Sequence, residues 1–339
     1  MEYEVKKLLS PNLYTDIFSI TEGSTDFSRF ENKTVLVTGA AELLGIYLVS
    51  AFLINNDINS SNTRLIALDS HDDIFRKYGK LTNRPDVDFL VSRDYSALKG
   101  VSADYVIHTE SVRFLESDLA AVNLLEFVEK TNARAVLNSY RDIYGDVFNG
   151  KDKICEDDMG YLNPAKPESR NIQAQRAAES LAVWFCENRN TDLSLCRSSL
   201  IYGATEFDGE SKHVEIITRS LRGQTLNISP TDGIPQSYCY VTDAAEALLT
   251  VLLNGEKGEI YNISSGYISS PSLLAGNCVK IFPDKELKVA VNGNLKPVSP
   301  ISPTVRVLDN SKLCALGFTP RVSVAGGIVR AAKIISEVM

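Results

Sequence analysis

Two glycines, Gly39 and Gly45, bracket a short turn that follows an apolar segment and opens an amphipathic one. A strand–turn–helix unit that binds a dinucleotide needs its first glycine for the tight turn and its last for close helix–strand contact. The N–H groups at the helix N-terminus then attract phosphate. Ala41, Leu43 and Leu44 form the rest of the surface that a diphosphate would meet. The spacing therefore predicts a dinucleotide site.

An acidic residue, Asp69, ends the next apolar segment, about 25 residues further along, as the dinucleotide motif requires. A carboxylate at that position accepts hydrogen bonds from the adenine-ribose hydroxyls, which favours NAD over NADP. Glu42 takes the place of the middle glycine of the turn. Its carboxylate should repel a diphosphate unless the side chain points outward.

The elements that must position these residues alternate along the chain. Strands are predicted at 34–38, 64–70, 87–94, 103–109, 134–140 and 193–203, and helices near 42–55, 117–131 and 171–189. Continuously apolar strands that alternate with helices indicate a parallel sheet covered on both faces. We expect an α/β fold, a doubly wound Rossmann sheet over 33–203. An N-terminal extension (1–32) precedes it, and a smaller substrate lobe (mainly 204–339) is interleaved with it.

Composition narrows the function classes. The chain has 339 residues, 44% of them hydrophobic, and 35 basic against 43 acidic residues give a net charge of −8. An acidic protein lacks the electrostatic pattern of a general nucleic-acid binder. No apolar run is long enough for a membrane span, and the N-terminus lacks a signal-peptide core. Scattered cysteines and three histidines give no metal-binding cluster. We expect a cytoplasmic protein with no membrane, nucleic-acid or metal partner.

Further motifs follow in order: KTVLVTGAAELLG from Lys33, YVIH (105–108), DIYG (142–145), RSSLIYG (197–203) and TDGIPQSYCYVTDAAEALL (231–249). With these motifs the sequence resembles the extended short-chain dehydrogenase/reductase family, and within it the NAD-dependent epimerase/dehydratases of nucleotide sugars. The resemblance covers most of 33–335. It implies that Asp94 lies near the adenine and that His108 borders the nicotinamide ribose.

The family's chemistry uses a Tyr and a Lys four residues apart on one helix, so that both share a face. The lysine lowers the tyrosine pKa, and the phenolate removes a hydroxyl proton. Here one register places Asn171 and Gln175 at these positions, and another places Lys166 and Arg170 there. Neither register supplies a tyrosine.

The family's Ser/Thr position falls on Tyr140, with Ser139 beside it. We therefore expect Tyr140 as acid/base group, Ser139 as its hydrogen-bonding neighbour and Lys166 as the cation that lowers its pKa. The alternative is that Tyr140 only fills the space of the missing tyrosine.

The loop after His108 is short, and the family's small Ala-Ala stretch there is replaced by TES (109–111). Glu110 and Glu116 of this loop are expected to face solvent. The resemblance places Gln236 where the family has its diphosphate-binding arginine, and Arg306 as a second phosphate clamp.

Two functions follow. The first is an enzyme that oxidises the sugar ring of a nucleotide-linked hexose with tightly held NAD and then epimerises, dehydrates or reduces it. The second is an inactive member that binds NAD or a nucleotide sugar, or that scaffolds an active homologue. A third possibility is a reductase or lyase that acts on a different substrate with a relocated site, but no residue of the sequence specifically supports it. The resemblance also implies a homodimer through the helices near 117–131 and 171–189, where Ala174, Ala177, Ala178 and Ala182 would permit close packing.

Overall fold

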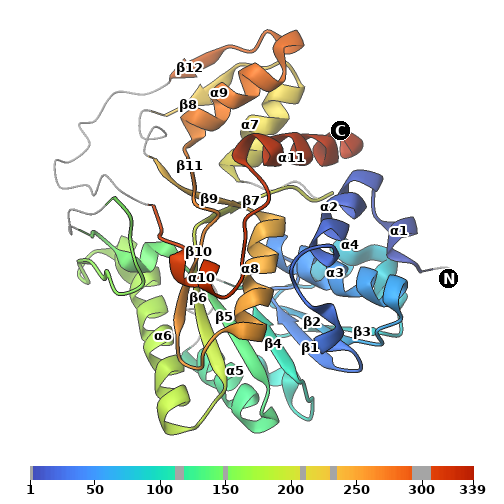
Figure 1. Cartoon of the computed structure of the whole chain (residues 1–339), viewed down its shortest axis with the longest axis vertical. Coiled ribbons are helices and arrows are strands. Elements are labelled where there is room, and N and C mark those ends of the chain that lie inside the picture. Colours follow the sequence, from blue (N-terminus) through green and yellow to red (C-terminus); the bar gives the residue numbers. More distant parts are fainter. Residues whose placement is uncertain (1–2, 111–117, 148–151, 207–210, 230–234, 292–306) are drawn as a thin grey trace.

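Seven parallel strands form the central sheet of the protein, in the order β10-β6-β5-β4-β1-β2-β3 (Figure 1). The structure is a computed structural model that describes residues 3–110, 118–147, 152–206, 211–229, 235–291 and 307–339. The strands are β1 (Thr34–Thr38), β2 (Arg64–Asp69), β3 (Val87–Val91), β4 (Tyr105–His108), β5 (Arg134–Tyr140), β6 (Leu193–Ser198) and β10 (Ile260–Ile263). The predicted α/β Rossmann sheet is confirmed.

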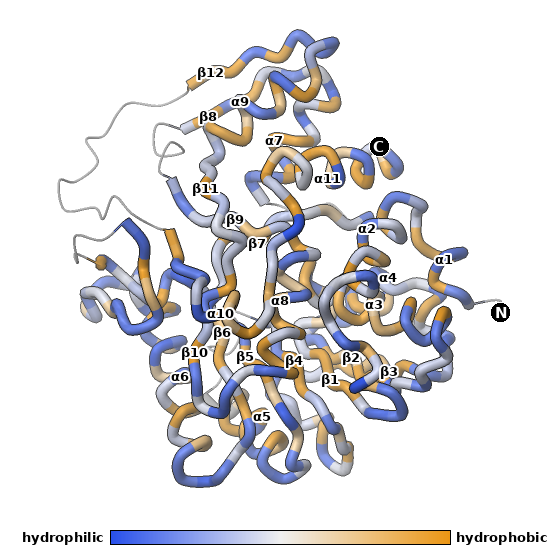
Figure 2. Tube along the Cα trace, viewed as in Figure 1, coloured by the Kyte–Doolittle hydropathy of each residue, from blue (hydrophilic) through white to orange (hydrophobic). Residues whose placement is uncertain are grey.

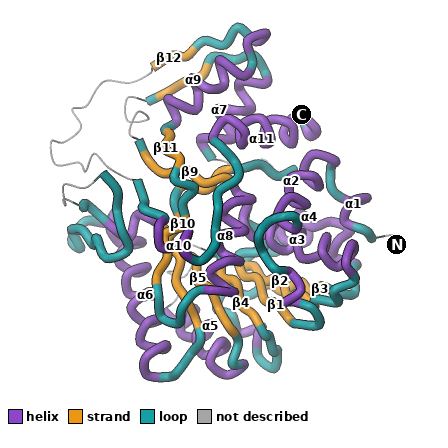
Figure 3. Tube along the Cα trace, viewed as in Figure 1, coloured by secondary structure: helices purple, strands orange, loops and turns teal. Residues whose placement is uncertain are grey.

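Helices cover both faces of this sheet, which the apolar strands require (Figures 2 and 3). Along β1, Val35 and Val37 join the core under α3 (Leu43–Asn59) and α8 (Val241–Asn254), whereas Leu36 joins the opposite core. That second core is closed by α5 (Asp118–Thr131) and α6 (Arg170–Asn188). Successive side chains of one strand point to opposite faces of the sheet and therefore pack in two different cores.

The predicted strand 193–203 is divided in the structure. β6 stays in the central sheet, whereas β7 (Leu200–Tyr202) pairs with β9 (Gln236–Tyr240), which also pairs with β11 (Tyr267–Ser269). The chain thereby passes from the sheet towards the upper lobe in Figure 1. That lobe contains β8 (Leu226–Ile228), β12 (Val289–Val291), α7 (Lys212–Leu221), α9 (Pro271–Ile281) and α11 (Val324–Val338). The short α10 (Ser311–Ala315) lies back beside β10.

The N-terminal segment forms two helices, α1 (Val5–Leu8) and α2 (Pro11–Thr21). α2 packs against α3, α8 and α11, so it touches both lobes (Figure 1). Its buried Asp16 accepts hydrogen bonds from the hydroxyls of Tyr47 on α3 and Tyr240 on β9, and pairs with Arg330 on α11. The extension is therefore built into the fold.

Strand order reverses between β1 and β4, because β2 and β3 lie on one side of this pair and β5 and β6 on the other. Open α/β sheets bind their ligands outside the carboxyl ends of the strands at such a reversal. Gly39 follows β1 there, and Thr109 and Glu110 follow β4. The sheet therefore places the candidate site at this edge.

Candidate functional site

The turn after β1 has the geometry that its glycines predict. Gly39 has φ +69°, a conformation that favours glycine. A Cβ there would lie 2.7 Å from Thr109 Oγ1 and 2.9 Å from the amide nitrogen of Glu110. A Cβ on Gly45 would lie 2.1 Å from the carbonyl oxygen of Gly39. Both glycines are thus required by contact, one with the end of β4 and one within the turn itself.

Helix α3 begins at Leu43, and Glu42 precedes it as the N-cap residue. The Glu42 side chain makes no capping hydrogen bond and is exposed. It nevertheless lines the same cavity as Leu43 and Leu44. Its carboxylate therefore lies at the mouth of the site.

Asp69 ends β2 and is 1% exposed. Its carboxylate accepts hydrogen bonds from the amides of Ala41 (2.9 Å) and His71 (3.2 Å). Asp94 lies after β3 and accepts hydrogen bonds from the amide of Ser96 and the hydroxyl of Ser92. The bonds from Ser96 hold the pKa of Asp94 below its usual value.

Two side chains of α4 (Asp73–Tyr78) tie down the carbonyls of the turn. The Tyr78 hydroxyl donates to the Ala40 carbonyl at 2.8 Å, and Lys77 Nζ donates to the Ala41 carbonyl at 2.8 Å. Lys77 also pairs with Asp73 at 3.1 Å. This fixes the carbonyls of Ala40 and Ala41 in place.

A cavity of about 330 Å³ runs from the start of α3 to the end of β5. It is lined by Glu42, Leu43, Leu44, Thr109, Glu110, Asn138, Tyr140, Ser199, Leu200 and Ile201. Burial raises the pKa of Tyr140 above its usual value, and the carboxylates of Glu42 and Asp142 raise it further. The phenol is therefore protonated at neutral pH and can donate a hydrogen bond.

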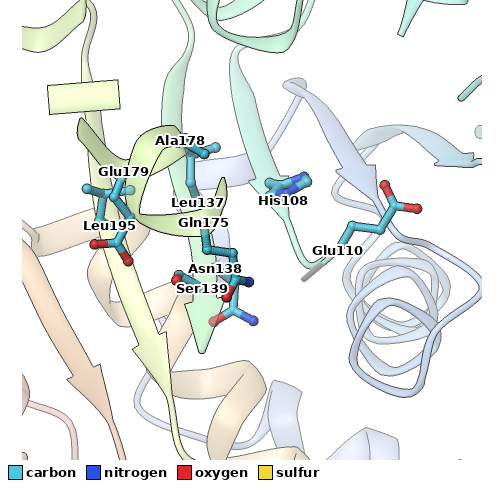
Figure 4. Close-up of a pocket in the computed structure, with 9 residues that line it drawn as sticks. All are labelled: His108, Glu110, Leu137, Asn138, Ser139, Gln175, Ala178, Glu179 and Leu195. Atoms are coloured by element: carbon cyan, nitrogen blue, oxygen red, sulfur yellow. The ribbon is translucent and has the colours of Figure 1, made fainter. Parts of the chain in front are cut away.

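A second, smaller cavity of about 30 Å³ lies on the other side of the β5 end (Figure 4). Ser139, Asn138, His108 and Gln175 line it. Ser139 and Tyr140 thus line different cavities, because successive side chains of a strand point to opposite faces. The structure does not bring the predicted pair together. It brings Ser139 to Gln175, the residue that one of the two registers places at the family's lysine position.

His108 is buried at the end of β4, with Nδ1 2.6 Å from Thr38 Oγ1. Burial lowers the pKa of His108 to about 3, so the ring is neutral. It lines the small cavity rather than the large one.

Lys166, Asn171 and Gln236 do not line the cavity that contains Tyr140. Lys166 is exposed before the 3₁₀ turn that leads into α6, and Asn171 is exposed in the first turn of that helix. Gln236 is the first residue of β9, partly buried, and lines neither cavity. Arg306 lies outside the described residues. Lys166 is not among the charges that shift the pKa of Tyr140.

Glu110 was expected to face solvent, and that expectation is wrong: the residue is 5% exposed. Its Oε2 accepts a hydrogen bond from the Tyr95 hydroxyl at 2.9 Å, and it lines both cavities. Sequence reasoning missed Glu110 and Tyr95 as site residues. The position of Glu110 directly after β4 was the available signal. Glu116 lies outside the described residues.

Among the described residues, no three His, Cys, Asp or Glu side chains gather in a way that could hold a metal ion. Within the same residues, no helix combines the length and apolar character needed to cross a membrane.

Comparisons with known proteins agree with the fold. The family model of the NAD dependent epimerase/dehydratase family matches residues 35–264. UDP-glucuronic acid decarboxylase 6 of Arabidopsis thaliana is 24% identical over 311 residues, which cover 88% of this chain and 87% of that protein.

Two solved structures have the same fold. The dTDP-glucose 4,6-dehydratase of Bacillus anthracis, in complex with NAD, has a TM-score of 0.74 and 18% identity, over 90% of this chain and 97% of that one. The UDP-glucose 4-epimerase of Thermotoga maritima, with UDP-glucose, has a TM-score of 0.71 and 20% identity, over 90% and 99%. The motifs, the sheet order and the family match together show that this chain belongs to the NAD dependent epimerase/dehydratase family.

Proposed function

We propose that this chain binds NAD and a nucleotide-linked hexose in the cleft at the carboxyl edge of its sheet, and that it does so without the family's Tyr–Lys proton transfer. The main support for this proposal is the cavity of about 330 Å³ that extends from the dinucleotide turn to Tyr140. Related proteins of this fold are described with NAD or with UDP-glucose. The family position and the cavity together support a bound dinucleotide next to a sugar nucleotide.

The residues of the turn fit NAD in most respects. The tight approach at Gly39 and the uncapped N-terminus of α3 would hold the diphosphate, and Asp69 would hold the adenine ribose. When bound, NAD supplies a hydride acceptor. The carboxylates of Glu42 and Glu110 are the features that oppose it, because both line the cavity next to the turn.

Binding without the usual turnover is the reading that the catalytic positions favour. Asn171 is exposed and Gln175 cannot carry a charge, so neither forms a tyrosine–lysine pair. Tyr140 is held protonated by burial and by neighbouring carboxylates. Loss of a general base typically costs about 10²–10⁴-fold in rate. Oxidation of a sugar hydroxyl, which needs a base, is therefore disfavoured.

A second candidate rests on the same phenol. A protonated Tyr140 at the cavity wall would donate its proton to the oxygen of a carbonyl group whose carbon receives a hydride from bound NADH, and solvent would then reprotonate the phenolate. At neutral pH this would favour the reductive direction. Ser139 and Lys166 would take no part, since Ser139 faces the other cavity and Lys166 is exposed.

We also propose a homodimer through α5 and α6. Ala177 and Trp184 of α6 are exposed, and Ala174 and Ala178 are partly so. Ala182 is buried in the chain's own core and does not belong to that face. Sedimentation velocity of wild type and Ala177→Glu tests this, with a dimer that the variant splits as the expected result.

The first experiment uses the protein as purified. Denaturation releases any bound NAD(H) for absorbance and mass spectrometry, and thermal-shift titrations follow with NAD, NADP and UDP-, GDP-, CDP- and dTDP-sugars. We expect stabilisation by NAD and by one sugar nucleotide, without NADH formation. NADH formation that Tyr140→Phe abolishes would contradict the absence of turnover. Absence of any NAD effect at millimolar concentration would contradict the proposal as a whole.

A further inference from the structure

The turn between β1 and α3 uses two of its amides within the chain. The amide of Ala41 donates to Asp69 at 2.9 Å, and the amide of Glu42 donates to the carbonyl of Gly39 at 3.1 Å. α3 begins at Leu43, and the first amides of a helix have no partner inside that helix. A diphosphate at this turn therefore has to be held mainly by the first amides of α3.

Two carbonyls of the same turn are held from outside by α4. The Tyr78 hydroxyl donates to the Ala40 carbonyl, and Lys77 Nζ donates to the Ala41 carbonyl, each at 2.8 Å. A peptide group is planar and trans, so the direction of its carbonyl also sets the direction of the next residue's amide. Tyr78 thereby orients the amide of Ala41, and Lys77 orients the amide of Glu42. These two peptide groups lead the chain into α3.

Tyr78 is fixed by the core of the sheet lobe. It is 4% exposed, and its ring centre lies 4.7 Å from that of Phe89 on β3. Burial raises the pKa of its hydroxyl, which therefore stays a hydrogen-bond donor at neutral pH. The same hydroxyl lies 3.4 Å from the carbonyl oxygen of Gly45. One buried side chain therefore contacts both the start of the turn and the first turn of α3.

Lys77 reaches the turn from the partly exposed side of α4. Its side chain is 20% exposed, and Asp73, one helical turn earlier, pairs with the ammonium at 3.1 Å. A lysine loses rotamer freedom when it is held in one place, and this loss costs free energy. Here the ion pair with Asp73 and the bond to Ala41 offset that cost. The carbonyl of Ala41 is thus held in place before a ligand binds.

We infer that Lys77 and Tyr78 are positioning residues for the dinucleotide, and that they act on its diphosphate rather than on its adenosine. They hold the carbonyls of Ala41 and Ala40, and so keep the amides at the start of α3 directed at the phosphates. Preorganisation of this kind raises affinity, because binding does not have to order the turn. The inference rests on the proposed NAD site and deepens it, since it assigns affinity to residues outside the glycine motif.

The test measures NAD binding by isothermal titration calorimetry to wild type, Tyr78→Phe and Lys77→Met. Tyr78→Phe removes the hydroxyl, keeps the ring and changes no charge, so a loss of affinity in this variant reports the position of the turn alone. Lys77→Met removes the ammonium and keeps most of the apolar stem. Each variant should bind NAD about fivefold more weakly, as expected when one orienting hydrogen bond is lost.

Matched controls remove the same chemical groups elsewhere. The Tyr105 hydroxyl donates to the Arg29 carbonyl at 3.4 Å, at the start of β4, so Tyr105→Phe removes a phenolic hydroxyl away from the turn. Lys80 follows α4 and is exposed, so Lys80→Met removes an ammonium that does not hold the turn. Both controls should bind NAD like wild type.

Adenosine, which lacks the diphosphate, is the second probe. Its affinity, measured by NMR titration, should change by less than about twofold in Tyr78→Phe and Lys77→Met, because its ribose would meet Asp69, which both variants retain. A merely structural role would lower the free energy of unfolding and leave the ratio of NAD to adenosine affinity unchanged. Urea unfolding of each variant therefore accompanies the titrations. The two variants remove different contacts, so the test stands if one of them does not fold.

The outcomes separate this inference from the proposed function. If both variants weaken NAD binding and spare adenosine binding, the inference holds. If wild type binds NAD and the variants bind it equally well, or lose NAD and adenosine affinity in equal measure, the inference fails and the NAD site stands. If wild type binds no NAD at millimolar concentration, the proposed function is overturned and the inference falls with it.

Discussion

The Asp16 carboxylate accepts a hydrogen bond from the Tyr240 hydroxyl, with 2.6 Å between the two oxygens, although the residues are 224 positions apart in the sequence. The same carboxylate accepts a hydrogen bond from Tyr47 at 2.8 Å and pairs with Arg330 at 3.1 Å. One side chain of the N-terminal α2 therefore joins α3 of the sheet lobe to β9 and to α11. The N-terminal segment holds the two lobes in one arrangement.

Asp16→Ala should lower the free energy of unfolding by about 3 kcal/mol, because it leaves two buried hydroxyls and a guanidinium without their shared acceptor. Urea unfolding followed by circular dichroism measures this. Glu337→Ala is the control, since it removes only exposed bonds between α11 and Asn12 of α2 and should cost less than about 1 kcal/mol. Equal losses in the two variants would refute the special role of Asp16.

Sequence reasoning predicted the sheet but neither the contacts of Asp16 nor the burial of Glu110. Periodicity is local, so 134–140 could be predicted as a strand, and the Gly39–Gly45 turn could be predicted from its neighbours. The partners of Asp16 lie 31, 224 and 314 residues away, and no local pattern identifies them. Glu110 was expected to face solvent because it lies in the shortened loop after His108, whereas its burial depends on Tyr95 and on the turn at Gly39. The division of 193–203 between two sheets could not be predicted either, because a continuous apolar segment does not show where the chain leaves one sheet and enters another.

The second prediction concerns pH and His213 on α7. This ring is buried between Tyr202 and Tyr238, and neither ring nitrogen has a hydrogen-bond partner among the described residues. Burial, with a smaller contribution from the charge of Arg141, lowers the pKa of His213 to about 4. The folded state therefore holds the ring neutral where the unfolded chain, with a pKa near 6.5, takes up a proton.

Because the folded state disfavours protonation of His213, the free energy of unfolding falls as the pH is lowered. The stability contribution of His213 is fully present above pH 6.5 and is lost as the pH falls towards about 4, with a loss of about 2 kcal/mol at pH 5. His213→Phe keeps the ring packing and removes the proton, so its advantage over wild type should grow by this amount between pH 7.5 and pH 5. Urea unfolding across that range measures it, and parallel pH profiles would contradict the assignment. His71 and His108 are present in both wild type and His213→Phe, so their contributions to the pH dependence cancel in the comparison.

A third prediction tests the ion pair that anchors α6 to the sheet. Arg197 of β6 and Glu179 of α6 are both buried and meet at 2.7 Å, and the guanidinium also lies 4.8 Å from the centre of the Tyr144 ring. Glu179→Ala should cost about 3–5 kcal/mol, because it leaves a buried guanidinium unpaired. The double variant Glu179→Leu/Arg197→Met should cost less than this single change. Thermal and urea unfolding of the variants measure the difference, and a double variant as unstable as the single would show that the pair itself is required.

The last prediction isolates the contact on which the dinucleotide turn is built. A Cβ on Gly45 would lie 2.1 Å from the Gly39 carbonyl oxygen and 2.7 Å from Ala40 Cα, and backbone atoms of a tight turn cannot move aside. Gly45→Ala should therefore lift α3 from β1, lower the free energy of unfolding by about 3 kcal/mol and weaken NAD binding.

Gly276→Ala on α9 is the matched control, because nothing lies within 4 Å of the added Cβ. Alanine is the better helix former by about 1 kcal/mol, so this variant should be as stable as wild type or slightly more stable. Unfolding by urea and NAD titration of both variants give the comparison. A Gly45→Ala protein with wild-type stability and NAD affinity would mean that the turn tolerates a wider approach of α3, and the diphosphate site would then have to be placed elsewhere along the sheet edge.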